Sequence, residues 1–125
     1  ELRRDGIDCE RWNLLHPMDE PRVPHVAACV SSKPGPVIAA TDYMRIYADS
    51  VRPYIKKTFK VLGTDGFGRS DSRDNLRRFF EVNRFYVTLA ALSALADDGL
   101  IERKVLADAI KKYGIDPNKP NPTTV

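Results

Sequence analysis

The sequence has few of the residues that build cross-linked, metal-bound or catalytic centres. It contains two cysteines, Cys9 and Cys29, and two histidines among 125 residues. Two cysteines are too few for the disulfide framework of a small secreted domain, so we expect reduced thiols and a cytoplasmic protein. Two histidines also leave few possible members for a Ser-His-Asp or Cys-His site.

The sequence also lacks long apolar runs and blocks of one charge. No run approaches the ~20 apolar residues of a membrane-spanning helix, and no signal-peptide pattern opens the chain. Basic and acidic residues are interleaved, as in Glu102-Arg103-Lys104, and the net charge is only +3. No basic stripe forms, so the sequence predicts neither a membrane nor a nucleic-acid partner.

What remains is the composition of one folded domain. Hydrophobic residues make up 42% of the chain and charged residues 30%, which is typical of globular proteins. A chain of 125 residues allows one domain at most. Its first residue is Glu1 rather than Met, and a helix is expected from Leu2 onward. We therefore expect a segment of a longer polypeptide.

The residue pattern predicts two short strands among several helices. The apolar runs at 36–40 and 59–62 are typical of buried strands in a parallel sheet. Two strands rarely make a stable sheet, so we expect further strands outside this sequence. Helices are predicted where apolar residues recur every three or four positions between caps and turn residues. Four of them are expected at 2–15, 23–30, 73–81 and 102–113, the last with Gly114 as its C-cap. A fifth begins at a cap, Thr41 or Asp42, and is ended or kinked by Pro53. A sixth begins at the cap Asn83 and is broken by residues 97–99.

Two stripes of side chains are expected to face other parts of the protein. Tyr43, Tyr47 and Tyr54 share one face of the helix after the first strand, which predicts core packing or a subunit contact. On the last predicted helix, the residues expected to face inward are Val105, Leu106, Ala109 and Ile110.

Residues 62–73 form the most informative stretch of the chain. An apolar segment leads into three glycines, and a basic segment that is compatible with a helix follows. This order of strand, tight turn and helix is typical of an α/β crossover, where open sheets place ligands and partner surfaces. The candidate interface residues of this turn are Gly63, Asp65, Gly66, Phe67, Gly68, Arg69, Ser70, Asp71 and Arg73.

The turn does not match the known nucleotide-binding motifs. Gly68 is followed by Arg69 and Ser70 rather than by the Lys-Ser/Thr of a Walker loop, and the third glycine of a dinucleotide fingerprint is absent. A helix start beside Arg69 and Arg73 still suits a phosphate or a carboxylate. Since Asp65 and Asp71 would repel an anion, we expect them to cap N–H groups or to pair with arginines. A structural or interface turn is the favoured interpretation, and anion binding is the alternative.

Other constellations are weaker. Among the cysteines and histidines only His25 and Cys29 have the spacing of metal ligands, and two ligands do not make a zinc site. Cys29 is expected to be a small buried residue, and His16 a partner at a helix end. No serine has the flanking glycines of a nucleophile elbow. We therefore predict no catalytic, cofactor-binding or metal-binding residue in this chain.

Six motifs occur in one order along nearly the whole chain, and the run at 64–71 is the most specific of them. Together they resemble the C-terminal region of the homodimeric pyruvate dehydrogenases, the thiamine-diphosphate-dependent decarboxylating components of bacterial complexes. A more distant likeness links the chain to the C-terminal domain of transketolases. The motifs are residues 8–13, 21–24, 41–44, 62–73, 80–82 and 105–110.

The resemblance implies an α/β fold, a three-layer sheet like the transketolase C-terminal domain, with helices on both faces and its first strands missing from this chain. Residues 1–125 would be part of the C-terminal domain of a larger thiamine-dependent subunit in the bacterial cytoplasm. The whole subunit would bind thiamine diphosphate and Mg²⁺ in its preceding domains, decarboxylate pyruvate, and pass the acetyl unit to lipoyl groups of the dihydrolipoyl acetyltransferase component.

The implied role of this segment is not catalytic. It would contact the other domains of its subunit and a second copy of that subunit, supporting dimerisation and framing the active site. The alternative is a stand-alone α/β module that binds an anion or phosphate at residues 63–73. Both interpretations depend on the same turn, of which residues 66–73 would face a neighbouring domain or the second subunit in the first.

Overall fold

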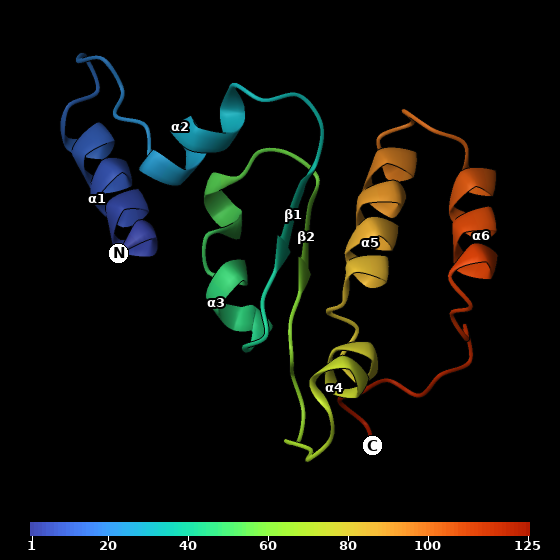
Figure 1. The fold of residues 1–125 in the computed structure, drawn as a ribbon. Coiled ribbons are helices and arrows are strands. Elements are labelled where there is room, and N and C mark those ends of the chain that lie inside the picture. The colour runs from blue at the N-terminus through green and yellow to red at the C-terminus, as the bar shows by residue number, and fades with distance from the viewer.

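The computed structural model describes all residues from 1 to 125 (Figure 1). Helices dominate, and two short strands lie at the centre of the chain. The elements are α1 (Leu2–Leu15), α2 (His25–Ser31), β1 (Val37–Ala40), α3 (Arg45–Asp49), the 3₁₀ helix η1 (Arg52–Tyr54), β2 (Phe59–Leu62), α4 (Arg73–Phe79), α5 (Arg84–Asp97) and α6 (Arg103–Lys112).

The two strands are parallel, and Val37 pairs with Phe59 at the start of a four-residue register. Helix α5 contacts both strands, and α3 contacts β2. Figure 1 shows α3 and α5 on opposite sides of the strands, with α6 packed on the outer side of α5. The three-layer α/β arrangement predicted from the sequence, with both of its strands, is confirmed.

Local signals set several helix ends. The side chain of Asn83 accepts hydrogen bonds from the N–H groups of Phe85 (3.0 Å) and Tyr86 (3.2 Å), as an N-cap should. Gly114 follows α6 at a φ of 60°, a left-handed conformation that glycine adopts without strain. Both predicted caps are confirmed.

The predicted start of α3 is wrong. Neither Thr41 nor Asp42 caps it, because the helix begins at Arg45. The carbonyl oxygens of Asp42 and Tyr43 instead accept hydrogen bonds from Thr64, which holds this backbone in a turn. A contact between segments far apart in sequence thus overrides the local capping signal.

Two predicted burial positions, Val105 and Cys29, are also wrong, and two tyrosines of the predicted stripe do not pack in a core. Tyr43 and Tyr47 are exposed, and only the third tyrosine of the stripe, Tyr54, packs inward against Gly6. Val105 is exposed because α6 packs mainly on α5, which leaves the flank of α6 that carries Val105 uncovered. Cys29 lies exposed on α2, although both cysteines are free thiols as expected. The amphipathic pattern locates these helices but overestimates how much of each one is covered.

The chain buries little of its own surface. Only 7 of 125 residues are buried, and no large side chain is fully enclosed. The accessible surface is 8994 Å², whereas a compact monomer of 14.1 kDa exposes roughly 6,700 Å². A surface about one third larger than expected indicates faces that a compact protein would cover.

One of these uncovered features is the outer edge of β1. The N–H of Val37 donates to Thr58, and that of Thr41 donates to Leu62. Alternate residues of a parallel strand bond to the same neighbour, so the backbone of Ile38 and of Ala40 faces away from β2. On the far edge of β2, by contrast, Arg52 donates to the carbonyl of Phe59 (2.9 Å). Both strands of a two-stranded sheet have an outer edge, and a side chain occupies one carbonyl on the β2 edge whereas none bonds the β1 edge.

The packing of α5 gives a direct test of the core. Ala94 has no exposed surface, on the helix that contacts both strands and α6. We expect Ala94→Leu to lower the free energy of unfolding by about 1–3 kcal/mol, because the added carbons have no space. The matched control is Ala107→Leu at an exposed position of α6. Urea denaturation of both variants measures the difference, and equal midpoints would contradict this account of the core.

Candidate functional site

The candidate interface turn is tied to the loop after β1. The N–H of Thr64 donates to the carbonyl of Tyr43 (2.9 Å), and its hydroxyl donates to the carbonyl of Asp42 (2.9 Å). The carboxylate of Asp65 accepts from the N–H (3.0 Å) and from Nε (2.5 Å) of Arg45. Parallel strands end at the same edge of a sheet, so these two loops lie together there.

Two glycines of the turn have steric reasons to be glycine. A Cβ on Gly63 would lie 2.8 Å from the carbonyl oxygen of Tyr43. Gly66 has a φ of 106°, and its Cβ would lie 2.7 Å from the carbonyl oxygen of Pro122 in the C-terminal tail. Nothing lies within 4 Å of the corresponding position on Gly68. The first two glycines therefore allow close backbone packing, whereas the third lies in open space.

The aspartates of the turn act as expected from the sequence. Hydrogen bonds from Arg45 lower the pKa of Asp65. The carboxylate of Asp71 accepts from the side-chain amide of Asn75 (2.8 Å) and from the N–H of Ser72 (2.6 Å), which lower its pKa. Both carboxylates are thus engaged in holding the turn and the start of α4.

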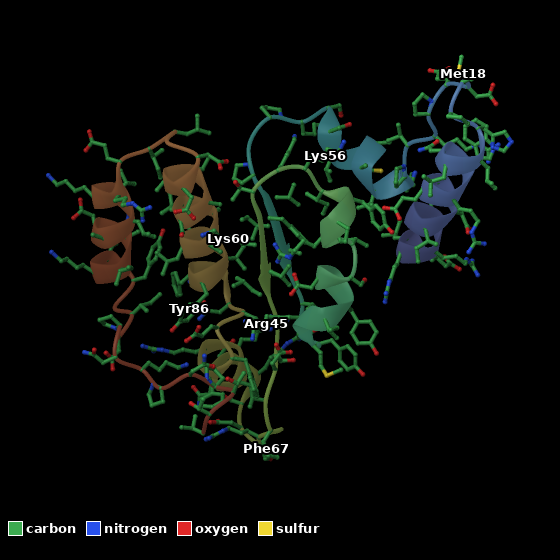
Figure 2. All side chains as sticks on the ribbon, turned by 180° about the vertical axis from the view of Figure 1, so that it is seen from behind. Met18, Arg45, Lys56, Lys60, Phe67 and Tyr86 are labelled. Carbon is green, nitrogen blue, oxygen red and sulfur yellow. The ribbon has the colours of Figure 1, made fainter.

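The tip of the turn points away from the protein. Phe67 is 82% exposed, and Figure 2 shows it at one extreme of the molecule. The guanidinium of Arg69 lies 4.1 Å from the ring centre of Phe79 on α4. On the same helix end, Lys119 of the tail donates to the carbonyl of Phe79 (2.7 Å) and to Glu81 (3.1 Å). The base of the turn is therefore anchored while Phe67 has no cover.

A hollow of about 410 Å³ lies beside the turn. Arg69, Arg73 and Arg77 line it together with Asp42 and Asp71. Arg73 makes no hydrogen bond or ion pair, and Arg77 lies 4.0 Å from Asp42. Three guanidinium groups would repel a magnesium ion, and nowhere do three His, Cys, Asp or Glu side chains come together. The residues that line this hollow therefore do not fit a magnesium site, and they include no nucleophile paired with a base.

The remaining sequence candidates lie far from the turn. His16 at the end of α1 hydrogen-bonds the carbonyl of Trp12 (2.9 Å), as expected of a helix-end partner. His25 and Cys29 lie 3.4 Å apart on α2, with no third ligand. No helix in the structure has the length and hydropathy to cross a membrane.

Sequence reasoning missed four residues that shape this site. Arg45 and Thr64 fix the two loops together, and the parallel order of the strands is the signal that could have found them. Lys119 bonds the end of α4 and Pro122 packs against Gly66, both from the tail that follows α6. The sequence carries no local signal for the contact between the tail and Gly66, because a segment without helix or strand shows no periodic pattern of apolar residues.

Two parallel strands between helices, with a glycine-rich turn after the second strand, define an α/β domain of the transketolase class. Residues 7–83 match the family of the transketolase-like TK C-terminal domain, and the chain belongs to that family.

Its relatives narrow the class further. The chain is 61% identical over 125 residues to the pyruvate dehydrogenase E1 component of Cupriavidus necator. The aligned region is all of this chain and 14% of that protein. The corresponding proteins of Pseudomonas aeruginosa (62%) and Escherichia coli K12 (56%) match over 123 residues, which is 98% of this chain and 14% of each relative. The resemblance to pyruvate dehydrogenase is confirmed, and the chain spans about one seventh of the length of these enzymes.

Substitutions at Gly66 and Gly68, two residues apart, test whether the C-terminal tail packs against the turn. We expect Gly66→Ala to lower the free energy of unfolding by about 1–3 kcal/mol, because the positive φ and the Pro122 carbonyl both oppose a side chain. Gly68→Ala, in open space, should change stability by less than about 0.5 kcal/mol. Urea denaturation compares them, and equal losses would show that the tail does not pack against the turn.

The Asp65 carboxylate predicts a pH dependence. Its folded pKa lies below the unfolded value of about 3.9, so its stabilising effect is present at neutral pH and is lost as the pH falls through the lowered pKa. We expect Asp65→Asn to cost about 1 kcal/mol at neutral pH, since the pair with Arg45 is partly exposed. The gap between variant and parent should shrink as the pH is lowered toward about 3. A gap independent of pH in urea titrations would contradict this role.

Proposed function

We propose that residues 1–125 are part of the C-terminal domain of the decarboxylating subunit of a homodimeric pyruvate dehydrogenase, and that this part has no catalytic group. The observation that carries the proposal is the accessible surface of 8994 Å², in a chain that covers 14% of its relatives' length. A surface about one third larger than that of a compact protein suits a segment packed within a larger one. The absence of a nucleophile and base pair at the turn agrees with a supporting role.

In this proposal the chemistry takes place elsewhere in the subunit. The full enzyme decarboxylates pyruvate and transfers the acetyl unit to lipoyl groups of the dihydrolipoyl acetyltransferase component, in the bacterial cytoplasm. It uses thiamine diphosphate and Mg²⁺, which other domains of the same subunit hold. The arginine-lined hollow beside the turn supports that assignment, because it offers no cage for a magnesium ion.

The free edge of β1 supports the proposal that this domain continues beyond these residues. The backbone groups of Ile38 and Ala40 have no partner strand, and parallel sheets are normally covered and extended on both sides. We expect strands from the same subunit to pair with β1. Such pairing would complete a sheet that two strands alone do not stabilise.

The role of the turn in dimerisation and active-site framing is tested in the full-length subunit. We expect Phe67→Ala to weaken the homodimer or to lower pyruvate turnover by roughly tenfold, since exposed aromatic anchors commonly carry interface energy. Leu100→Ala is the control, because Leu100 is also exposed but lies near Lys56 at the opposite end of the sheet. Sedimentation velocity and steady-state kinetics measure both effects. Unchanged dimer mass and turnover in the Phe67 variant would contradict this role.

A second candidate function is anion binding by a stand-alone module. The observation that favours it is Arg73, a guanidinium with no partner in a hollow shared with Arg69 and Arg77. Calorimetric titration with inorganic phosphate and diphosphate separates the two functions. Saturable binding that is lost in the Arg73→Ala variant would support anion binding. The absence of any heat of binding would favour the non-catalytic role within the larger enzyme.

A further inference from the structure

Three adjoining hollows meet at Arg77 on α4. Their volumes are about 410, 520 and 270 Å³, and Arg77 and Val82 line all three of them. We call this continuous depression the Arg77 groove. It follows α4 from the glycine turn to the start of α5, and Ala40 lines it where β1 ends (Figure 1). Open α/β sheets commonly bind ligands outside this end of their strands.

The arginines of the groove have almost no partners within the chain. Only Arg77 approaches a carboxylate, that of Asp42 at 4.0 Å. By contrast, Arg45, Arg52 and Arg103 each form an ion pair with an aspartate at 3.3 Å or less. Guanidinium groups without a carboxylate partner remain available to bind an oxyanion. The arginines that line the groove are Arg69, Arg73, Arg77, Arg78 and Arg84.

Two of these guanidinium groups rest on aromatic rings. Arg69 lies 4.1 Å from the ring centre of Phe79, and Arg84 lies 4.8 Å from that of Phe85. A guanidinium stacked in this way uses its flat face, so the N–H groups at its edge stay free to donate. The stacking also restricts the side chain, which lowers the entropic cost of holding a ligand.

The largest of the contacts that the groove offers is a paired one. Arg73 and Arg77 are one helical turn apart on α4 and line the same hollow of about 410 Å³, so both can donate to one oxyanion. The half-buried side chains of Leu76, Phe80 and Val82 line this hollow too. Its volume is within the range of small-molecule sites, about 300–1,000 Å³. The hollow thus combines a cationic rim with an apolar wall.

The charges of the groove determine the charge of its ligand. Five arginines and three aspartates line it, so two positive charges remain uncompensated. Asp71 is already engaged, because its Oδ1 accepts from the N–H of Ser72 and the amide of Asn75. Asp42 is 74% exposed and accepts no hydrogen bond through its carboxylate. A ligand that carries two negative charges matches this balance.

We propose that the Arg77 groove binds a small organic anion in which two negative charges adjoin an apolar group, as in a phosphate monoester or a dicarboxylate. Arg73 and Arg77 hold the oxyanion, and the apolar wall contacts the rest of the molecule. The hollow has no nucleophile paired with a base, so the ligand is held and not transformed by these residues. The inference rests on the anion-binding candidate for its ligand class, and it does not require the module to stand alone.

Calorimetric titration of the full-length subunit tests the groove. The probes are phenyl phosphate and isophthalate, which carry two negative charges on an aromatic ring, and inorganic phosphate, which has no ring. We expect one of the aromatic probes to bind saturably and about tenfold more tightly than inorganic phosphate, because its ring covers apolar surface. The tighter aromatic probe identifies the ligand as a phosphate monoester or a dicarboxylate. The absence of saturable binding of either one would overturn the proposal, and equally tight binding of inorganic phosphate would overturn the role of the apolar wall.

The variant Arg77→Gln locates the binding. We expect it to weaken the binding of the tighter probe about tenfold or more, since charge-assisted hydrogen bonds are lost. The matched control is Arg11→Gln on α1, which removes the same charge from an exposed position outside the groove and should change the affinity less than about twofold. Equal weakening in the two variants would show that the probe responds only to net charge. Unchanged binding in Arg77→Gln would place the probe elsewhere, and either result overturns the site.

The variant Asp42→Asn tests the site in the opposite direction. The carboxylate of Asp42 competes with the ligand for Arg77 and repels it, so its removal should tighten binding roughly threefold. Asp19→Asn, at an exposed position between α1 and α2, is the control and should have no such effect. A misfolded site does not bind more tightly, so this result is informative even if Arg77→Gln disturbs α4. Unchanged or weaker binding in Asp42→Asn would overturn the competition at Arg77.

The groove and the proposed function can fail separately. If the full-length protein did not decarboxylate pyruvate, that function would be wrong while the titrations could still be measured. If inorganic phosphate gave no heat and an aromatic probe bound through Arg77, the stand-alone anion module would be wrong and the groove would stand. If the enzyme were active and neither aromatic probe bound, the function would stand and the groove would be wrong.

Discussion

The hydrogen bonds between the loops after β1 and β2 are the constraint on which the candidate site depends. Thr64 bridges to the backbone of Asp42 and Tyr43, and Asp65 holds Arg45. The strands themselves are only four residues long, so their pairing alone leaves the loops free to move. The bridge turns two separate loops into one rigid edge, and it also prevents the first loop from continuing as a helix.

The rest of the molecule is built outward from a core that is small for 125 residues. Helix α5 covers one face of both strands, α3 covers part of the other, and α1 contacts mainly α2 (Figure 1). Chains of this size usually enclose several large side chains, whereas here none is fully enclosed and Ala94 is the most buried core residue. The small core leaves apolar surface uncovered, which agrees with the proposal that this chain packs within a longer subunit.

Much of the fold could be predicted from the sequence, because its signals are local. The apolar runs locate β1 and β2, Asn83 sets the start of α5, and the aspartates of the turn bind N–H groups as expected. The errors arise where distant segments decide the outcome. Thr41 looks like a cap, yet its segment is held by Thr64. The helical spacing of Tyr43 and Tyr47 is compatible with a core, yet both are exposed and only Tyr54 of that stripe packs inward. No periodicity encodes the contact of the tail with Gly66, since it joins two irregular segments.

The position of Pro122 has a practical consequence for work on this protein. Its carbonyl oxygen lies against Gly66, and it is one of the few buried residues although it is near the last position of the chain. A tag or label inserted next to Pro122 would disturb the backbone that packs against Gly66, the neighbour of Phe67. A label intended to leave the structure unchanged would then alter the position of the turn, so purification tags should be placed elsewhere in the chain.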